Sequence, residues 1–374
     1  MKTPKRIKGR LVAGRQNCIA FTGGGTAGHV FPAVSIVQNL LKDWSGRVIW
    51  IGSRSGMEKK LLSGVPVTYY GIPSGKWRRY LSIRNFLDPF KVVSGILYSL
   101  ALLGARRPLL LFSKGGYVSV PPVVAARLLG IPVFTHESDF DPGLANRLNA
   151  LFAERIFTSF AETRDYFPAK LRRKVLLTGN PIRDSFLSSD AELGRRIIGC
   201  VQPRPIVLVI GGSQGSVPIN NLVSRIVARL TDRAFVVHQM GWDGYSPTQR
   251  PNYFTTAFFG EEFPHILACA DLVVSRAGAN TLAELAALGK PAILIPLPLS
   301  GSRGDQIRNA RFFSDQGASI LFNEETGSPE DLLEIMNDLL DNRARLRELG
   351  RRMASLGFPQ ASRTITRLIR ERMN

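Results

Sequence analysis

The sequence predicts an α/β protein made of two doubly wound units, and three observations support this fold class. Apolar, strand-like runs alternate with helical patterns along most of the chain. Two glycine-rich turns, at residues 23–28 and 211–215, each follow an apolar run and precede a helical pattern. The length of 374 residues also exceeds what one hydrophobic core usually holds. We therefore expect two domains that face each other across a deep cleft.

In the first half of the chain, helical patterns rather than hairpin turns separate the expected strands. The expected strands cover residues 18–21, 48–51, 67–70, 109–112, 133–135, 155–158 and 175–178. The expected helices cover residues 31–42, 57–62, 87–103, 121–129 and 143–151. Because parallel strands need crossover connections, this alternation predicts a parallel sheet with helices on both faces.

The second half repeats the alternation after a turn-rich segment at residues 179–183. Its expected strands cover residues 206–210, 234–239, 253–257, 272–275, 292–295 and 319–322. Its expected helices cover residues 219–230, 263–268, 280–287, 306–316 and 331–341. The expected domains are therefore residues 16–180 and 181–355. Residues 356–374 contain a further expected helix that can pack back on the N-terminal domain.

The net charge of +20 is unusual, although 44% apolar and 21% charged residues are ordinary for a globular protein. Basic residues cluster at residues 1–15 and 343–372, which favours a polyanionic partner, either nucleic acid or an anionic membrane. No nucleic-acid-binding module is recognisable. The longest apolar run, residues 92–105, is shorter than the roughly 20 residues that span a bilayer, so membrane contact should be peripheral. The three distant cysteines are expected to be free thiols, and the four histidines lack metal-ligand spacing.

The first glycine turn carries two alternative interpretations. Gly23, Gly25 and Gly28 match a dinucleotide-binding pattern, but the next strand ends at Arg54 without the acidic residue that would hold a ribose. An NADP-dependent oxidoreductase stays open as an alternative, although it leaves the second turn unexplained. His29 follows the turn at the start of a helix that Pro32 is expected to help begin. The helix dipole disfavours an imidazolium ion there, so His29 is a candidate general base or else a structural residue.

A second candidate anion site lies at residues 275–284, between an expected strand and an expected helix. The N–H groups at that helix start can hold a diphosphate without a metal, and Thr281 adds a hydroxyl donor. Glu284 lies one turn beyond Asn280 and can accept hydrogen bonds from ribose hydroxyls. The alternative is a well-capped helix without a ligand. The polar loop at residues 300–309 follows the next strand, at the same edge of the sheet.

Several motifs in this order resemble the peptidoglycan N-acetylglucosaminyltransferases of glycosyltransferase family 28. They are GGGTAGHVFP at residues 23–32, HES at 136–138, GNPIR at 179–183, GGSQG at 211–215 and RAGANTLAE at 276–284. The resemblance implies a GT-B fold of two Rossmann-like domains and inverting transfer of GlcNAc from UDP-GlcNAc to the 4-hydroxyl of MurNAc in lipid I, which forms lipid II. It also implies no cofactor or metal, no nucleic acid, and a peripheral location on the cytoplasmic face of the bacterial plasma membrane. Such an enzyme serves cell-wall synthesis, cell shape and cell division.

The resemblance also implies roles for individual residues. His29 would be the catalytic base. UDP-GlcNAc would be bound by Thr26, Ala27, Gly28, Asp139, Arg183, Ser213, Gly260, Ala279, Asn280, Thr281, Leu282, Ala283, Glu284 and Gln306. The chain departs from the family pattern at Ala27, where glycine is usual, and at Ser138 and Asp139, where many members have Gln-Asn. An ionised Asp139 accepts hydrogen bonds but does not donate them.

The segment at residues 75–91 is expected to contact the membrane and the lipid-linked acceptor. It interleaves basic residues, which attract anionic headgroups, with aromatic and aliphatic residues, which can embed shallowly. The membrane and acceptor residues are Lys76, Trp77, Arg78, Arg79, Tyr80 and Tyr117. The alternative is an ordinary amphipathic helix packed on the sheet.

Overall fold

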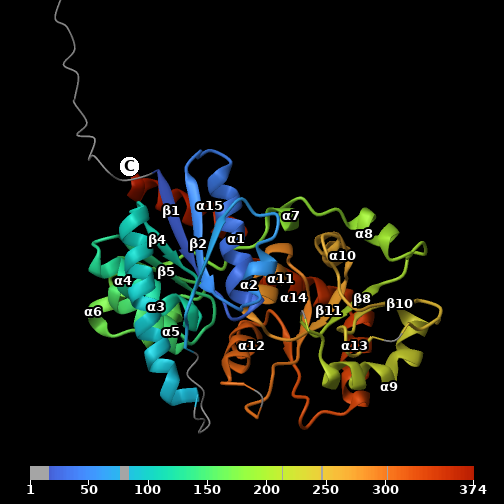
Figure 1. The fold of residues 1–374 in the computed structure, drawn as a ribbon. Coiled ribbons are helices and arrows are strands. Elements are labelled where there is room, and N and C mark those ends of the chain that lie inside the picture. The colour runs from blue at the N-terminus through green and yellow to red at the C-terminus, as the bar shows by residue number, and fades with distance from the viewer. Residues whose placement is uncertain (1–16, 76–83, 213, 246, 301) are drawn as a thin grey trace, which may run out of the picture.

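The computed structural model describes residues 17–75, 84–212, 214–245, 247–300 and 302–374, which form two α/β domains side by side (Figure 1). The first sheet has seven strands in the order β3-β2-β1-β4-β5-β6-β7, and the second has six in the order β10-β9-β8-β11-β12-β13. Every strand pairs in parallel with its neighbours in the sheet. The strand order reverses at β1 and β8, where ligands bind in folds of this type. The predicted fold class is therefore confirmed.

The strands of the first domain lie close to their expected positions. They are β1 (Cys18–Thr22), β2 (Arg47–Ser53), β3 (Thr68–Ile72), β4 (Leu111–Ser113), β5 (Val133–Glu137), β6 (Arg155–Thr158) and β7 (Val175–Leu177). The helices are α1 (Ala27–Leu41), α2 (Glu58–Leu61), α3 (Arg84–Arg106), α4 (Val120–Leu128), α5 (Leu144–Phe152) and α6 (Ala169–Arg172), with 3₁₀ turns η1 (Tyr117–Ser119) and η2 (Glu162–Tyr166). The central strands β1 and β5 are buried along their whole length, because helices cover both faces of the sheet.

The second domain begins with two short helices, α7 (Asp184–Leu187) and α8 (Ala191–Ile197), that lead to its first strand. Its strands are β8 (Ile206–Ile210), β9 (Phe235–Gln239), β10 (Tyr253–Thr256), β11 (Leu272–Ser275), β12 (Ala292–Leu294) and β13 (Ile320–Leu321). Its further helices are α9 (Val217–Arg233), α10 (Phe263–Cys269), α11 (Ala279–Leu288), α12 (Asp305–Asp315), α13 (Pro329–Asp341) and α14 (Arg343–Ser355). The short α8 and the arginine-rich α14 have no counterpart among the expected elements.

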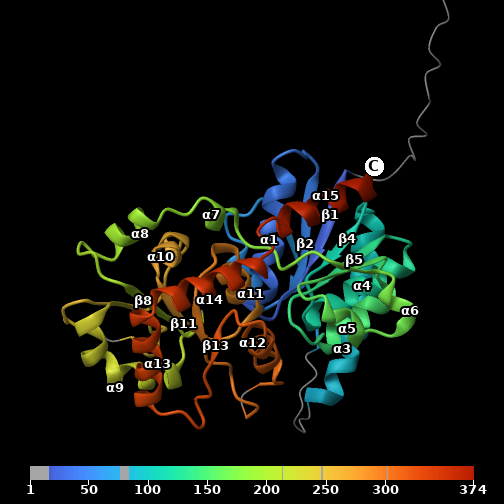
Figure 2. The same ribbon diagram turned by 180° about the vertical axis from the view of Figure 1, so that it is seen from behind.

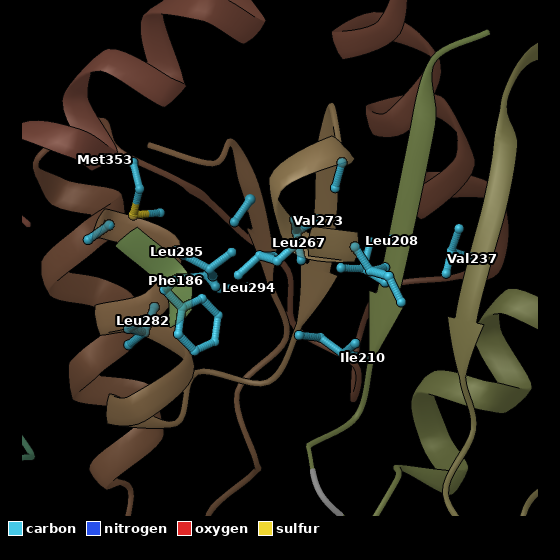
Figure 3. Close-up of a cluster of buried hydrophobic side chains, with 14 of the residues drawn as sticks. Phe186, Leu208, Ile210, Val237, Leu267, Val273, Leu282, Leu285, Leu294 and Met353 are labelled. Carbon is cyan, nitrogen blue, oxygen red and sulfur yellow. The ribbon is translucent and has the colours of Figure 1, made fainter. Parts of the chain in front are cut away.

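One face of the second sheet packs against helices that are distant in sequence (Figure 3). Phe186 of α7, Leu285 of α11 and Met353 of α14 join the same buried cluster as the inward side chains of β8 and β11. Cys200 and Cys269 are free thiols within this cluster, as expected from the cysteine spacing. The helix α14 is therefore held by its few apolar residues, although most of its sequence is polar.

The last helix, α15 (Ala361–Met373), leaves the second domain and packs against α1 of the first (Figure 2). Ile365 and Ile369 are fully buried in the core cluster under the first sheet. Arg370 forms an ion pair with Asp43 at 3.2 Å, and Arg372 pairs with Glu154 at 2.8 Å. Part of the C-terminal basic cluster therefore fastens the last helix to the first domain.

We expect Ile369→Ala to lower the free energy of unfolding of the first domain by about 2–5 kcal/mol. The side chain is fully buried, so its removal leaves a cavity between α15 and the sheet. Urea denaturation of the full chain measures the effect. Arg367→Ala on the exposed face of α15 is the matched control and should change stability by less than about 0.5 kcal/mol. Equal effects of the two substitutions would contradict this role of the buried face.

Helix α3 is longer than expected from the sequence, and part of its surface is exposed. Among the described residues, it is the one helix long and apolar enough to cross a membrane by length and composition, with a 19-residue stretch at Asp88–Arg106 of mean hydropathy 1.2. The expectation that this run is too short is therefore wrong on length, because the helix continues beyond residues 92–105 at both ends. One side of α3 packs along α4. Phe90, Val93 and Leu97 are 73%, 56% and 62% exposed, so an apolar face is open on the first domain.

Candidate functional site

Two asparagines of the second domain bridge to the first domain at the carboxyl edges of the sheets. Asn280 Nδ2 donates to the Gly28 carbonyl at 3.3 Å, and Asn309 Nδ2 donates to Asp139 Oδ1 at 3.0 Å. Asn309 Oδ1 also accepts from the Phe140 N–H at 3.0 Å. These contacts bring the first glycine turn and the end of β5 against α11 and α12. The structure therefore places residues of both domains in one site.

The first glycine turn leads directly into α1, which begins at Ala27 rather than at residue 31. Pro32 lies inside the helix, so the expectation that it helps begin the helix is wrong. Proline has no N–H and cannot donate to the Gly28 carbonyl one turn earlier. That carbonyl instead accepts from Asn280. The proline therefore frees an acceptor for the contact between the domains.

The N-termini of α1 and α11 have no side-chain cap. Their N-cap residues, Thr26 and Gly278, make no side-chain hydrogen bond to the helix, and neither first turn contains an acidic residue. The first N–H groups of both helices are therefore available to an anion. Gly25 shapes the turn before α1, because its φ is +87° and a Cβ there would lie 2.8 Å from the Tyr117 ring. Tyr117 thus lies against the first glycine turn.

His29 lies in the first turn of α1 and is partly exposed. Burial, together with the charges of Lys114 and Arg303, lowers the pKa of His29 to about 4. The ring also makes a hydrogen bond to the Lys114 backbone. His29 is therefore neutral at pH 7 and can accept a proton. Its neighbours favour the neutral form in addition to the dipole of α1.

Arg183 and Glu284 contribute opposite charges beside α11. Burial raises the pKa of Glu284 to about 7, and the nearby Arg183 guanidinium opposes this rise. Arg183 is the N-cap residue of α7, and its guanidinium lies 6.0 Å from the ring centre of Phe31 and 5.1 Å from that of Phe186. Aromatic rings on both domains therefore fix the position of this cation.

The second glycine turn is braced from within its own domain. Arg276 Nη2 donates to Ser216 Oγ at 2.7 Å, and Arg276 forms a buried ion pair with Glu324 at 2.8 Å. Gln239 Nε2 donates to the Gly212 carbonyl at 3.0 Å. These bonds hold the turn at the carboxyl end of β8. Removing one partner of a buried ion pair leaves the other charge buried and unpaired, which is strongly destabilising. Arg276 is therefore a structural support of the site.

The other residues expected to bind the donor or the acceptor differ in how directly the structure connects them to the site. Gln239 Oε1 accepts from the Phe259 N–H at 2.9 Å, which places the following Gly260 beside the second glycine turn. Gln306 Oε1 accepts from the Leu297 N–H at 3.1 Å, so its own amide N–H groups remain for a ligand. Ser213 and the segment with Lys76, Trp77, Arg78, Arg79 and Tyr80 lie outside the described residues.

Sequence patterns assign no role to three polar residues of the site. Asn180 Nδ2 donates to Asn280 Oδ1 at 2.8 Å, Asn309 joins α12 to Asp139, and Lys114 is fully buried beside His29. Asn180 stands in the turn motif and Asn309 ends the polar loop, so sequence position marks both as near the sheet edge. Neither sequence position indicates which residue of the other domain the side-chain amide of Asn180 or Asn309 would contact.

Two doubly wound domains with uncapped helix N-termini at their junction are typical of nucleotide-sugar-dependent enzymes of GT-B architecture. The family model described as glycosyltransferase family 28 N-terminal domain matches residues 19–158, and the corresponding C-terminal domain model matches residues 206–365. The chain belongs to glycosyltransferase family 28. The predicted resemblance and enzyme class are confirmed.

The chain is also similar to named relatives and to a solved structure. A protein of Treponema pallidum (strain Nichols) is 42% identical over 96% of each chain, and one of Lachnoclostridium phytofermentans is 43% identical over 87% of this chain and 91% of its own. Both are named UDP-N-acetylglucosamine–N-acetylmuramyl-(pentapeptide) pyrophosphoryl-undecaprenol N-acetylglucosamine transferase. The crystal structure of Acinetobacter baumannii MurG is 27% identical with a TM-score of 0.74, over 95% of this chain and 99% of that one. No comparison supports the oxidoreductase alternative.

Proposed function

We propose that this protein transfers GlcNAc from UDP-GlcNAc, with inversion, to the 4-hydroxyl of MurNAc in undecaprenyl-pyrophosphoryl-MurNAc-pentapeptide. The observation that carries this proposal is the pair of uncapped N-termini of α1 and α11, which face one site from two domains. The shared name of the relatives supplies the donor and the acceptor. The domain bounds 16–180, on the acceptor and membrane side, and 181–355, on the donor side, belong to the same proposal. Residues 356–374 contain the helix that packs back on the N-terminal domain.

The donor would lie mainly on the second domain. The N–H groups of Ala279, Asn280 and Thr281 at the start of α11 would hold the diphosphate, and Arg183 would add a positive charge. Glu284 would accept hydrogen bonds from the ribose hydroxyls, and Leu282 and Ala283 of the same helix would also border the donor. Ser213 and Gly260 would contact the nucleotide, and the amide N–H groups of Gln306 would bind the GlcNAc hydroxyls.

Transfer would take place beside the first glycine turn. The acceptor 4-oxygen forms a bond to the GlcNAc anomeric carbon as the bond from that carbon to the UDP oxygen breaks, and UDP leaves with the electron pair. His29 takes the hydroxyl proton on the ring nitrogen that does not bind the Lys114 backbone. Thr26, Ala27 and Gly28 would border this reaction centre, and Asp139, which accepts from Asn309, would contact the sugar. Helix N-termini and Arg183 stabilise the charge that develops on the leaving diphosphate.

The test is radiolabelled GlcNAc transfer from UDP-GlcNAc to a polyprenyl-pyrophosphoryl-MurNAc-pentapeptide acceptor. Formation of a labelled lipid product with a β linkage supports the proposal. Hydrolysis of UDP-GlcNAc without transfer, or no heat of binding with UDP-GlcNAc in calorimetry, would overturn it.

We propose that the exposed face of α3 makes a peripheral contact with an anionic membrane at the cytoplasmic face of the plasma membrane. The segment that precedes α3 in the chain would join this contact through Lys76, Trp77, Arg78, Arg79 and Tyr80. Phe90, Val93 and Leu97 can embed in the interface, and each basic residue near the surface contributes up to about 1 kcal/mol. Tyr117 lies near the first glycine turn and would meet the acceptor headgroup. This arrangement would present the lipid-linked sugar to the reaction centre.

We expect the double substitution Phe90→Asp and Leu97→Asp to weaken binding to vesicles that contain anionic lipid by at least tenfold, because two charges replace embedded apolar groups. Vesicle co-sedimentation measures the change. Val201→Asp is the matched control, because Val201 is 94% exposed on the second domain. Unchanged binding of the α3 variant would contradict the proposed membrane face.

A further inference from the structure

Lys114 is a fully buried lysine at the end of β4, and no step of the proposed reaction uses its ammonium group. Its backbone N–H donates to the Thr22 carbonyl at 2.9 Å, which fixes it at the carboxyl end of β1. A Cβ placed on Gly23 would lie 3.2 Å from the Lys114 Cβ, so the lysine packs directly against the first glycine turn. A lysine is almost never fully buried unless its charge is paired.

The Lys114 ammonium group starts a chain of hydrogen bonds that crosses both domains. Its Nζ donates to Ser138 Oγ, and Ser138 Oγ donates to Asn180 Oδ1 at 3.1 Å. Asn180 Nδ2 donates to Asn280 Oδ1 at 2.8 Å, and Asn280 Nδ2 donates to the Gly28 carbonyl at 3.3 Å. This series of hydrogen bonds therefore ends at Gly28, the residue before His29. The His29 ring itself forms a hydrogen bond with the Lys114 backbone.

Two carboxyl groups lie near the Lys114 ammonium group and affect its pKa. Burial lowers the pKa of Lys114 to about 8, although the charges of Glu137 and Asp139 act to raise it. The Glu137 carboxylate is itself held by the Gly143 N–H at 3.0 Å and by Asn146 Nδ2 at 2.9 Å. Lys114 therefore lies near two carboxyl groups, Glu137 and Asp139, and near two histidines, His29 and His136.

The groups that face His29 are cationic. Lys114 approaches it from the end of β4, and Arg303 approaches it from the loop before α12. The Glu58 carboxylate lies beneath the first glycine turn and is engaged by the Ser53 N–H at 2.6 Å. Two cations beside the ring disfavour an imidazolium ion there.

We propose that Lys114 is a positioning residue for sugar transfer, whose ammonium group, anchored by Ser138, aligns the first glycine turn with α11 beside His29. The Ser138 hydroxyl accepts the hydrogen bond from the Lys114 ammonium group. This bond joins two separate sequence motifs, SKGGY at residues 113–117 and HES at residues 136–138. This proposal extends the proposed function to a further residue. Only its kinetic test, the transfer assay, depends on the proposed function. Lys114 would touch neither the donor nor the acceptor.

The test is Lys114→Met, which has a similar length and no charge, compared with the wild-type protein by NMR titration of labelled histidine. The chain has only four histidines, so the His29 resonance can be assigned by a His29→Gln variant. We expect the pKa of His29 to rise by about one unit, because a neighbouring positive charge is removed. In the transfer assay, the acidic limb of the pH profile of kcat/KM should move upward by the same amount. At pH 7.5 we expect kcat to fall at least tenfold and the Kd of UDP to stay within about threefold.

Two further variants separate the possible outcomes. Ser138→Ala removes the anchor and keeps the charge, so kcat should fall while the pKa of His29 changes little. Lys174→Met is the matched control, because its ammonium group bonds the Ala153 carbonyl far from the site, and it should behave as wild type. An unchanged His29 pKa in Lys114→Met, or a kcat that is unchanged in both Lys114→Met and Ser138→Ala, would overturn the proposal. The NMR result stands even if no transfer is observed, so failure of the proposed function is distinguished from failure of this inference.

Discussion

Replacing His29 with alanine is expected to lower kcat by about 10²- to 10⁴-fold, the usual contribution of a positioned proton acceptor. The neutral ring at the start of α1, with a pKa lowered to about 4, can accept the proton of the attacking hydroxyl. Binding of UDP-GlcNAc should change by no more than a few-fold, because the donor would lie mainly on α11. Steady-state transfer assays and calorimetry with UDP-GlcNAc measure the two effects separately.

His265→Ala is the matched control for this prediction. His265 is partly exposed, accepts from the Asp190 N–H at 3.0 Å and lies outside the site, so transfer should be retained. Lost UDP-GlcNAc binding in His29→Ala would instead assign His29 to donor positioning. Retained turnover would remove it from the mechanism.

Replacing Glu284 with alanine is expected to weaken UDP binding by about 1.5–3 kcal/mol, or roughly 10- to 150-fold, because hydrogen bonds between a charged carboxylate and the ribose hydroxyls would be lost. Glu284 is partly buried on α11, beside the Arg183 cation that would hold the phosphates. Calorimetric titration with UDP measures the loss. Glu334→Ala, on the exposed face of α13, is a control that should bind UDP as the wild type does. Equal affinities of Glu284→Ala and wild type would exclude the ribose contact.

The same residue predicts how UDP binding depends on pH. Burial raises the pKa of Glu284 to about 7, so about half of the free protein carries a neutral carboxyl group at neutral pH. Ribose hydroxyls donate to the ionised form, so binding should release a proton, and affinity should rise with pH up to about 8 before it levels off. Glu284→Gln removes this titration and leaves only the pH dependence of UDP itself. Identical pH profiles for Glu284→Gln and wild type would contradict the assignment.

Most strands could be predicted from sequence because their apolar side chains point into both faces of a covered sheet. The run at residues 206–210 is apolar throughout and coincides with β8, in which all five residues are buried. The helix α14 could not be found in this way, because its arginines conceal the apolar positions Leu349 and Met353. Its packing partners lie on α11 and the second sheet, and no local pattern indicates them.

The site was only partly predictable for a related reason. Glycine turns and helix starts are local patterns, so the two uncapped N-termini could be expected where they occur. The bonds that join them are not local. Asn309 and Asp139 are 170 residues apart in the chain, and Lys114 is 24 residues from Ser138.

The sequence by itself determined the order of most strands and helices, the two glycine turns and the family, because these depend on local hydrophobic periodicity and on backbone conformations that only certain residues adopt. Only the tertiary structure decided that Pro32 leaves the Gly28 carbonyl free for Asn280, that α15 returns to the first domain, and that Lys114 is buried near His29 and two carboxyl groups. Each of these depends on which groups meet in the folded protein, where burial and neighbouring charge set hydrogen-bond partners and protonation states.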